Sequence, residues 1–211
     1  DAALAAQKPG DKPLAVFTDM DDTVLLPLPY WSRLIAQGRD FFDDPIWDEW
    51  VPQNDLVVAP GAKEFFEYCK EKGVEVFYIT SRDQGEKTYD YALENLKALG
   101  LPFADKEHLT VLTDSSNKEP RQKELAEKYT PVVYLGDNLN DFQRKYYIKG
   151  DVPGRLAAME ADREEFGRRF ILFPNPTDGH WMAAVFGESE PADTPEARKR
   201  LREAAETVIK P

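Results

Sequence analysis

The segment LAVFTDMDDT, residues 14–23, decides the fold of this 211-residue chain. Its first half is a short apolar run of the kind that forms a buried strand, and its second half carries three aspartates. In an extended segment Asp19 and Asp21 point to the same side, because side chains alternate along a strand. Two carboxylates at one strand tip repel each other unless a cation or a proton lies between them. The segment therefore predicts a buried strand with a candidate chemical site at its carboxyl end.

Outward from this segment, short apolar runs alternate with longer helical patterns. The apolar runs predict further strands at residues 74–80, 108–112, 131–135 and 169–173, and the helical patterns predict helices at 61–72, 86–99 and 118–128. In the first of these helices Phe65, Phe66 and Cys69 are expected on one face. Repeated strand–helix–strand units at this spacing favour the α/β class, with a Rossmann-like doubly wound parallel sheet and a small helical cap subdomain.

Two stretches depart from this alternation and define the expected domains. Residues 27–55 are rich in Trp, Phe, Pro and Asp, and they predict an inserted cap subdomain whose aromatic side chains mainly pack and secondarily offer a ligand platform. The tail, residues 188–211, predicts a terminal helix that starts at Thr194, runs toward Lys210 and packs on the small subdomain. Residues 10–26 and 56–187 are left as the core domain.

The composition restricts the classes of partner. Apolar residues make up 42% of the chain, which is enough to bury a core, and the net charge is −12. An acidic exterior repels nucleic-acid polymers and anionic membrane surfaces, so a basic-patch nucleic-acid binder is excluded. The single cysteine, Cys69, precludes an internal disulfide, and two histidines are too few for a histidine-rich metal site. No apolar run approaches the roughly 20 residues that a membrane-spanning helix needs.

Chemically active side chains follow the predicted strands. Ligands of open α/β sheets bind beyond the carboxyl ends of the strands. The positions there hold clustered carboxylates, hydroxyl groups and two cations: Asp19, Asp21, Thr80, Ser81, Arg82, Lys118, Asp137 and Asp141. If the fourth predicted strand lies beside the first, Asp137 joins the other aspartates, and three oxygen donors suit Mg²⁺. Each loop alone is more typical of a solvated turn, and only the coincidence of four strand ends favours a site.

Several other kinds of site are absent from the sequence. There is no Gly-x-x-x-x-Gly-Lys-Ser/Thr, no Gly-x-Gly-x-x-Gly and no Gly-x-Ser-x-Gly motif. The position six residues after Cys69 is Glu75 rather than arginine, which excludes a cysteine-phosphatase loop, and no Arg-His-Gly run is present.

The ordered motifs resemble those of the haloacid dehalogenase superfamily. They are Asp-x-Asp-x-Thr at 19–23, Thr-Ser-Arg at 80–82, a lysine at 118 and Gly-Asp-Asn-x-x-Asp at 136–141. The likeness is closer to the class C nonspecific acid phosphatases, runs from about Leu14 to Trp181, and includes VAPGAKEF at 58–65 and LFPN at 172–175. It implies a Mg²⁺-dependent acid phosphatase that hydrolyses nucleoside monophosphates or other small phosphomonoesters through an aspartyl-phosphate.

The resemblance also implies a role for each motif residue. Asp19 would be the nucleophile and Asp21 the general acid and base. The metal would be held by the Asp19 carboxylate, the main-chain carbonyl of Asp21, Asp137 and, behind them, Asp141. The substrate and its phosphoryl group would be bound by Thr80, Ser81, Arg82, Lys118 and Trp47.

Two positions depart from the class C pattern. Asp22 stands where many members have glutamate. Trp47 matches one of two aromatic residues that clamp the base in some nucleotide-cleaving relatives, whereas the second position is Asp178. A preference for nucleotides is therefore in doubt, because stacking on one ring is weaker than a sandwich.

Several alternatives stay open at this stage. A phosphotransferase of the same superfamily would use the same intermediate, and a non-catalytic acidic module would bind metal or phosphate on the same fold. The resemblance implies an exported bacterial protein, periplasmic or associated with the outer membrane, that would reach a membrane only through an N-terminal lipid anchor absent from this chain. A homodimer is one possible assembly.

Overall fold

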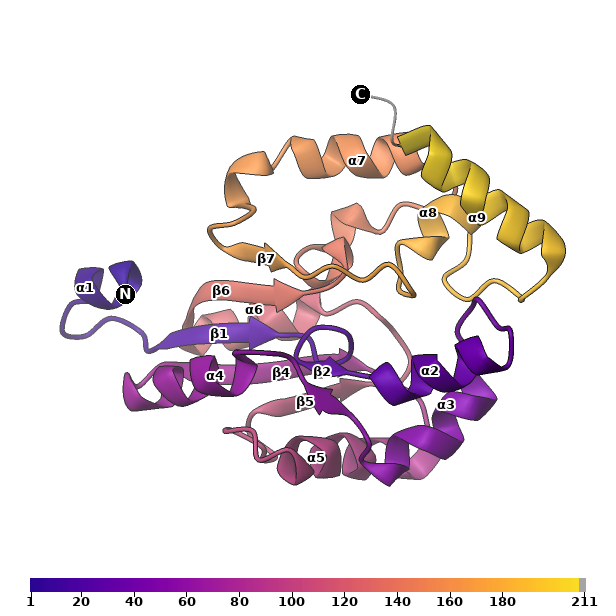
Figure 1. Ribbon diagram of the computed structural model, residues 1–211. Coiled ribbons are helices and arrows are strands. Elements are labelled where there is room, and N and C mark those ends of the chain that lie inside the picture. Colours follow the sequence, from indigo (N-terminus) through magenta and orange to yellow (C-terminus); the bar gives the residue numbers. More distant parts are fainter. Residues whose placement is uncertain (209–211) are drawn as a thin grey trace.

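Residues 1–208, which the computed structural model describes, form a five-stranded parallel sheet with helices on both faces (Figure 1). The strand order is β5-β4-β1-β6-β7. The strands are β1 (Leu14–Thr18), β4 (Glu75–Ser81), β5 (Leu109–Leu112), β6 (Thr130–Gly136) and β7 (Phe170–Leu172). Each neighbouring pair is parallel, so the carboxyl ends of all five strands lie at one edge. Five predicted strands are thus confirmed, and β6 is the direct neighbour of β1.

Side-chain alternation along the central strands divides the core between the two faces of the sheet. Val16, Val76 and Tyr78 pack in one cluster with α4 (Ala62–Glu71) and α5 (Thr88–Ala98). The intervening side chains face the opposite way and pack against α6 (Glu119–Lys128): Ala15, Phe17, Phe77 and Ile79 contact Leu125. Helices on both faces confirm the predicted doubly wound α/β fold.

Some helices differ from the sequence prediction. In α4, Phe66 and Cys69 are buried, but Phe65 is 37% exposed, because neighbouring residues of a helix are turned about 100° apart and one narrow stripe meets the sheet. The helix α7 (Val152–Glu160) has no counterpart among the predicted helices. Pro153 lies in the first helical turn, where its missing N–H is not needed, and the Asp151 side chain accepts the Gly154 N–H at 2.8 Å.

The inserted segment forms two helices between two short strands. β2 (Leu25–Leu26) pairs antiparallel with β3 (Val57–Val58), and α2 (Leu28–Ala36), α3 (Asp44–Trp50) and the 3-10 helix η1 (Val51–Gln53) lie between them. The fully buried Tyr30 lies at the centre, with its ring 5.3 Å from that of Trp31, 5.2 Å from Trp47 and 5.7 Å from Trp50. These rings mainly pack against one another.

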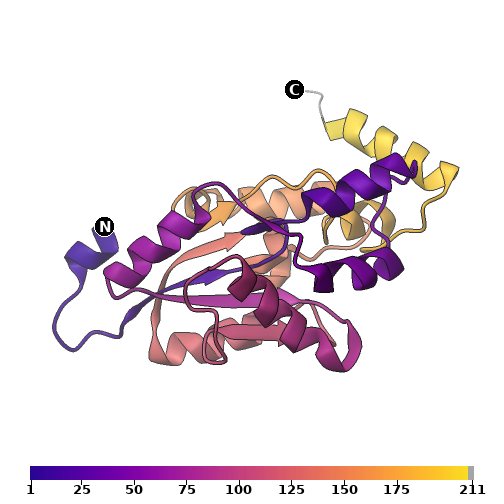
Figure 2. The ribbon, with the colours of Figure 1, turned by 60° about the horizontal axis from the view of Figure 1, so that its bottom comes forward.

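The C-terminal helix α9 (Pro195–Val208) lies beside α8 (Met182–Phe186), and its first turn reaches the loop that follows α2 (Figures 1 and 2). Thr194 caps it, as expected, by accepting the Ala197 N–H at 3.1 Å, and Arg198 donates to the Gly38 carbonyl at 2.8 Å. The predicted continuation toward Lys210 falls outside the described residues. The remaining helices are α1 (Ala2–Ala6) and the 3-10 helices η2 (Gly85–Lys87), η3 (Leu139–Asp141), η4 (Arg144–Tyr146) and η5 (Arg163–Glu165). Within residues 1–208, none of the helices combines the length and the apolar character needed to cross a membrane.

Candidate active site

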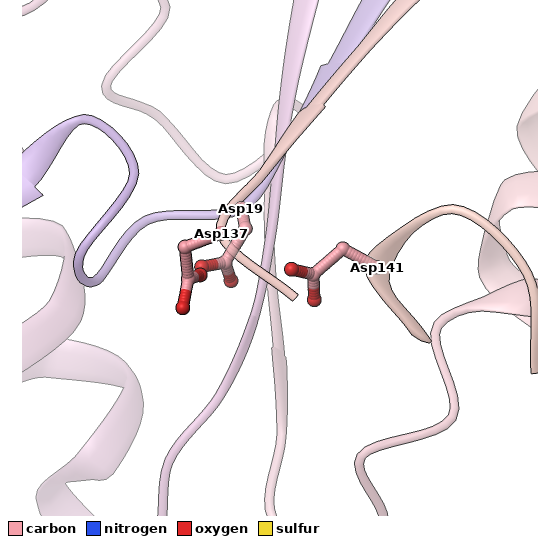
Figure 3. Close-up of side chains that lie close together, drawn as sticks. All are labelled: Asp19, Asp137 and Asp141. Carbon is pink, nitrogen blue, oxygen red and sulfur yellow. The ribbon is translucent and has the colours of Figure 1, made fainter. Parts of the chain in front are cut away.

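Three buried carboxylates lie together at the carboxyl edge of the sheet (Figure 3). Asp19 follows β1, Asp137 follows β6, and Asp141 ends η3. One oxygen from each carboxylate lies within 4.8 Å of the others. The strand order brings them together, because β6 is hydrogen-bonded directly to β1.

The turn after β6 fixes the orientation of Asp141. Asn138 begins η3 and forms a capping box with Asp141, in which the Asn138 N–H donates to Asp141 Oδ2 at 2.8 Å. Gly136 allows this close approach, because a Cβ there would lie 2.6 Å from Asp141 Oδ2. The sequence Gly-Asp-Asn-x-x-Asp is therefore a geometrical unit that directs two carboxylates to one place.

Lys118 is the cation of this cluster. It immediately precedes α6, is 4% exposed, and places its ammonium group against Asp19 and 2.8 Å from Asp141 Oδ1. Burial alone would lower the pKa of Lys118, but the charges of Asp141 and Asp19 outweigh it and hold the pKa above its ordinary value. Lys118 is thus a permanent cation in this site.

One lysine does not balance three carboxylates. Burial raises the pKa of Asp19 to about 6, opposed by Lys118 and reinforced by Asp141 and Asp21. The pKa of Asp137 lies well above its ordinary value because of burial and the neighbouring charges of Asp141 and Asp19. Such mutual repulsion is relieved when a cation joins the cluster, so the oxygen donors fit a hard divalent ion.

Asp21 lies beside the triad and is held by arginine. Arg82 Nε donates to Asp21 Oδ2 at 2.7 Å and Arg82 Nη2 donates to Oδ1 at 2.6 Å, which is the bidentate geometry of a strong ion pair. Arg82 is itself anchored by Asn95, whose Oδ1 accepts from Nη1 at 2.7 Å. Thr80 Oγ1 lies 3.5 Å from Asp21 Oδ2. Thus Arg82 and Thr80, expected to contact the phosphoryl group, contact Asp21.

Two connected hollows open at this edge. The inner pocket, of about 100 Å³, is lined by the carboxylate triad together with Lys118, Thr80 and Ser81. The outer cavity, of about 440 Å³, lies between the strand ends and the inserted segment, and Arg82 and Trp47 line it. The structure therefore brings Asp19, Asp21, Thr80, Ser81, Lys118, Asp137 and Asp141 around one pocket and places Trp47 and Arg82 in the adjoining cavity.

Two polar side chains of the site have no role in the sequence prediction. Thr23 Oγ1 donates to Asp19 Oδ2 at 3.2 Å and to Asp137 Oδ1 at 3.1 Å, so it links two of the three carboxylates. Asn175 Nδ2 donates to Asp137 Oδ2 at 2.8 Å. Asn175 follows β7, so applying the strand-end rule to the fifth predicted strand would have found it. The signal for Thr23 is its place in the Asp-x-Asp-x-Thr motif.

Comparisons with known proteins agree with this geometry. The family model described as HAD superfamily, subfamily IIIB (Acid phosphatase), matches residues 1–181. The Class C acid phosphatase from Bacillus anthracis has a structure with a TM-score of 0.85 and 31% identity, covering 96% of this chain and 83% of that chain. Its structure with tungstate bound gives a TM-score of 0.84 and 30% identity, covering 97% of this chain and 83% of that chain.

A plant protein provides a more distant likeness. Acid phosphatase 1 of Solanum lycopersicum is 28% identical over 131 residues, which are 58% of this chain and 49% of the relative. The chain thus spans about half the length of this curated relative.

Proposed function

The chain belongs to subfamily IIIB of the HAD superfamily, the acid phosphatases, and on that basis we propose that it hydrolyses small phosphomonoesters with Mg²⁺ through an aspartyl-phosphate intermediate. The observation that carries the proposal is the position of Asp19. Its carboxylate lies in the inner pocket beside Lys118, and Asp21 stands two residues further at the same wall. Tungstate, a tetrahedral oxyanion like phosphate, is bound in the structure of the Bacillus anthracis enzyme.

The donor set fits the metal that the family implies. Asp19, Asp137 and Asp141 offer carboxylate oxygens at mutual distances below 4.8 Å, and Lys118 compensates only part of their charge. We assign the ion to these carboxylates together with the main-chain carbonyl of Asp21. When bound, the divalent ion would offset the charge of the carboxylates and of the phosphoryl oxygens.

The reaction proceeds in two displacements on phosphorus. A carboxylate oxygen of Asp19 forms a bond to phosphorus, the bond from phosphorus to the ester oxygen breaks, and Asp21 gives its proton to the leaving alcohol. Water then attacks the phosphorus of the aspartyl-phosphate and loses a proton to Asp21, the bond to Asp19 breaks, and inorganic phosphate leaves. Lys118 and Thr80 stabilise the negative charge that spreads over the phosphoryl oxygens.

The test uses p-nitrophenyl phosphate with and without Mg²⁺. The wild-type chain is expected to release nitrophenol in a Mg²⁺-dependent reaction at acidic pH, and acid quenching is expected to trap phosphate on the protein. Asp19→Asn removes the nucleophile and is expected to abolish both signals. Turnover that survives in Asp19→Asn would refute the proposal, and phosphate appearing on an added alcohol rather than in solution would indicate a phosphotransferase.

Three further expectations remain proposals. Nucleoside monophosphates are one candidate substrate class, a homodimer is one candidate assembly, and export to the periplasm or the outer membrane rests on the likeness to bacterial class C enzymes. The relatives come from a bacterium and from a plant, so the family alone leaves the compartment open.

A further inference from the structure

The outer cavity continues from the inner pocket and must hold whatever is attached to the phosphate. The two hollows share Asp21, Asp22, Ser81, Asp178 and His180 in their walls. An ester whose phosphorus lies beside Asp19 therefore extends its alcohol portion into the outer cavity. Its volume of about 440 Å³ accommodates a small organic group.

The wall of this cavity is strongly acidic. Besides Asp21, it carries six carboxylates, in its depth and around its rim: Asp22, Asp44, Asp48, Asp83, Asp178 and Glu190. Among the described residues that line the cavity, Arg82 is the one arginine or lysine. Its guanidinium group already forms a bidentate ion pair with Asp21. His180 adds no charge, because burial lowers its pKa to about 4. An anionic leaving group would be repelled from this wall.

Aromatic rings line the same cavity next to the carboxylates. Tyr30, Trp31, Phe42 and Trp47 all contribute to the wall. Trp31 and Trp47 are 7% and 6% exposed, so only small parts of their rings reach the cavity. Aromatic faces attract cations through their quadrupole, and carboxylates add a direct Coulomb attraction. Rings and carboxylates together are the usual surroundings of a bound ammonium group.

From this cavity we propose a substrate class, resting on the phosphatase function proposed above: phosphomonoesters of a small alcohol that carries an amine or a quaternary ammonium group. The phosphate of such a zwitterionic ester would lie in the inner pocket, and its cation would lie in the outer cavity between the aromatic wall and the acidic rim. Neutral alcohols would gain only the aromatic contact, and anionic alcohols would meet the carboxylates.

The state of Asp178 agrees with this assignment. Burial raises its pKa to about 6, and the neighbouring charge of Asp44 adds to the effect. No salt bridge of Asp178 to a lysine, arginine or histidine occurs in the described part of the chain. An ammonium group in the cavity would supply the missing counter-charge.

The experiment compares two esters of nearly the same shape. Choline phosphate carries a trimethylammonium group, and 3,3-dimethylbutyl phosphate replaces its nitrogen by carbon and is neutral there. Rates are measured with Mg²⁺ at about pH 8, because burial raises the pKa of Glu190 to about 7, so the rim is largely ionised only above that value. Wild-type kcat/KM is expected to favour choline phosphate by about tenfold or more, the size of a desolvated cation–π contact with an added ion pair.

Variants separate recognition of the cation from the intrinsic reactivity of the two esters. Glu190 and Asp44 share a hydrogen bond, and Asp44 adds to the effect of burial on the pKa of Glu190, so Glu190→Gln and Asp44→Asn are combined in one variant. This double variant is expected to reduce the ratio of the two kcat/KM values several-fold. Glu188→Gln is the matched control, because Glu188 is exposed on the same loop but does not line the cavity. It is expected to leave the ratio unchanged.

The outcomes distinguish this inference from the proposed function. Equal kcat/KM values for the two esters, or a ratio that the double variant leaves unchanged, would overturn the cationic assignment while p-nitrophenyl phosphate is still hydrolysed. Hydrolysis of p-nitrophenyl phosphate without hydrolysis of either ester would overturn it too. A chain that hydrolyses none of the three phosphates would refute the phosphatase function itself, and the inference with it.

Discussion

Replacing Lys118 with methionine removes the cation that the structure places among the buried carboxylates. Lys118 is 4% exposed and contacts both Asp19 and Asp141. Loss of one partner of a buried ion pair leaves the other charge uncompensated and costs about 3–5 kcal/mol. In a chain of this size, 1 kcal/mol corresponds to roughly 2–4 °C in Tm. Lys118→Met is therefore expected to lower the Tm of the metal-free protein by about 6–20 °C.

The assay is thermal unfolding, followed by circular dichroism, first in a chelator and then with excess Mg²⁺. Because a divalent ion and Lys118 both offset the same carboxylates, Mg²⁺ is expected to raise the Tm of Lys118→Met more than that of the wild type. Lys123→Met is the matched control on the same helix. Lys123 is 77% exposed and pairs with Glu119, so its loss is expected to cost at most about 1 kcal/mol.

Two results would refute this reasoning. If Lys118→Met in chelator melts within about 2 °C of the wild type, the buried pair gives no net stabilisation. If Mg²⁺ raises both melting temperatures equally, the ion and Lys118 do not share the carboxylates. The same variant is expected to lower kcat for p-nitrophenyl phosphate by about 10²–10³-fold, since it removes a preorganised charge from the phosphoryl oxygens.

Three other changes test separate contacts. Arg82→Lys keeps the positive charge but loses the two parallel hydrogen bonds to Asp21. The kcat should therefore fall more for an alkyl phosphate, whose leaving oxygen needs a proton, than for p-nitrophenyl phosphate. Equal losses of kcat for the two substrates would contradict this reasoning. Because burial lowers the pKa of His180 to about 4 from 6.5, the unfolded chain binds more protons at this residue, and the contribution of His180 to the free energy of unfolding should fall as pH drops from 6.5 toward 4. Urea titrations across that pH range should show that the free energy of unfolding falls less for His180→Gln than for the wild type. If the two proteins show the same dependence on pH, the pH dependence does not come from His180. Asn175→Ala removes a hydrogen-bond donor to Asp137 and should weaken the affinity for Mg²⁺ about 10–100-fold. The affinity is measured from the dependence of kcat on the Mg²⁺ concentration, and an unaltered affinity would contradict the prediction.

The sequence alone was enough to predict where the residues that directly follow the strands lie. The carboxyl ends of parallel strands meet at one edge, so a correct list of strands places Asp19 and Asp137 together without any knowledge of side-chain contacts. The same rule brings in Asp141 and Lys118 through the loops after β6 and before α6. What decided these positions was local sequence pattern combined with sheet topology.

Strand positions and sheet topology did not predict which hydrogen-bond partner each side chain has. The motif Thr-Ser-Arg suggests contact with the phosphoryl group, yet Arg82 is turned toward Asp21 because Asn95, on α5, accepts a third hydrogen bond from it. Asn95 in turn donates to the Val51 carbonyl at 3.0 Å, so the inserted segment takes part in fixing the arginine. Such a chain of contacts joins residues far apart in sequence, and no local period or spacing encodes it.

The inserted segment was the least predictable part for a related reason. Its helices α2 and α3 are short and begin with proline in the first turn, and their buried faces meet one another as well as the sheet. A helical period is hard to detect when a short element is apolar on more than one side. Composition alone identified the aromatic cluster, whereas the central place of Tyr30 depends on packing.

The net charge of −12 is distributed unevenly around the site, and this distribution matters more than the total. Surface charges further away than about 8 Å are largely screened at physiological ionic strength, so the substrate responds mainly to the groups that line the two hollows. In the inner pocket, three carboxylates and one lysine leave two formal negative charges, which a single divalent ion would cancel. In the outer cavity, Arg82 balances only Asp21, and the remaining carboxylates have no lysine or arginine partner in the described cavity wall. A phosphate would thus meet a neutralised pocket while the group attached to it meets an acidic wall, a polarity that matches a substrate with its negative and positive charges at opposite ends.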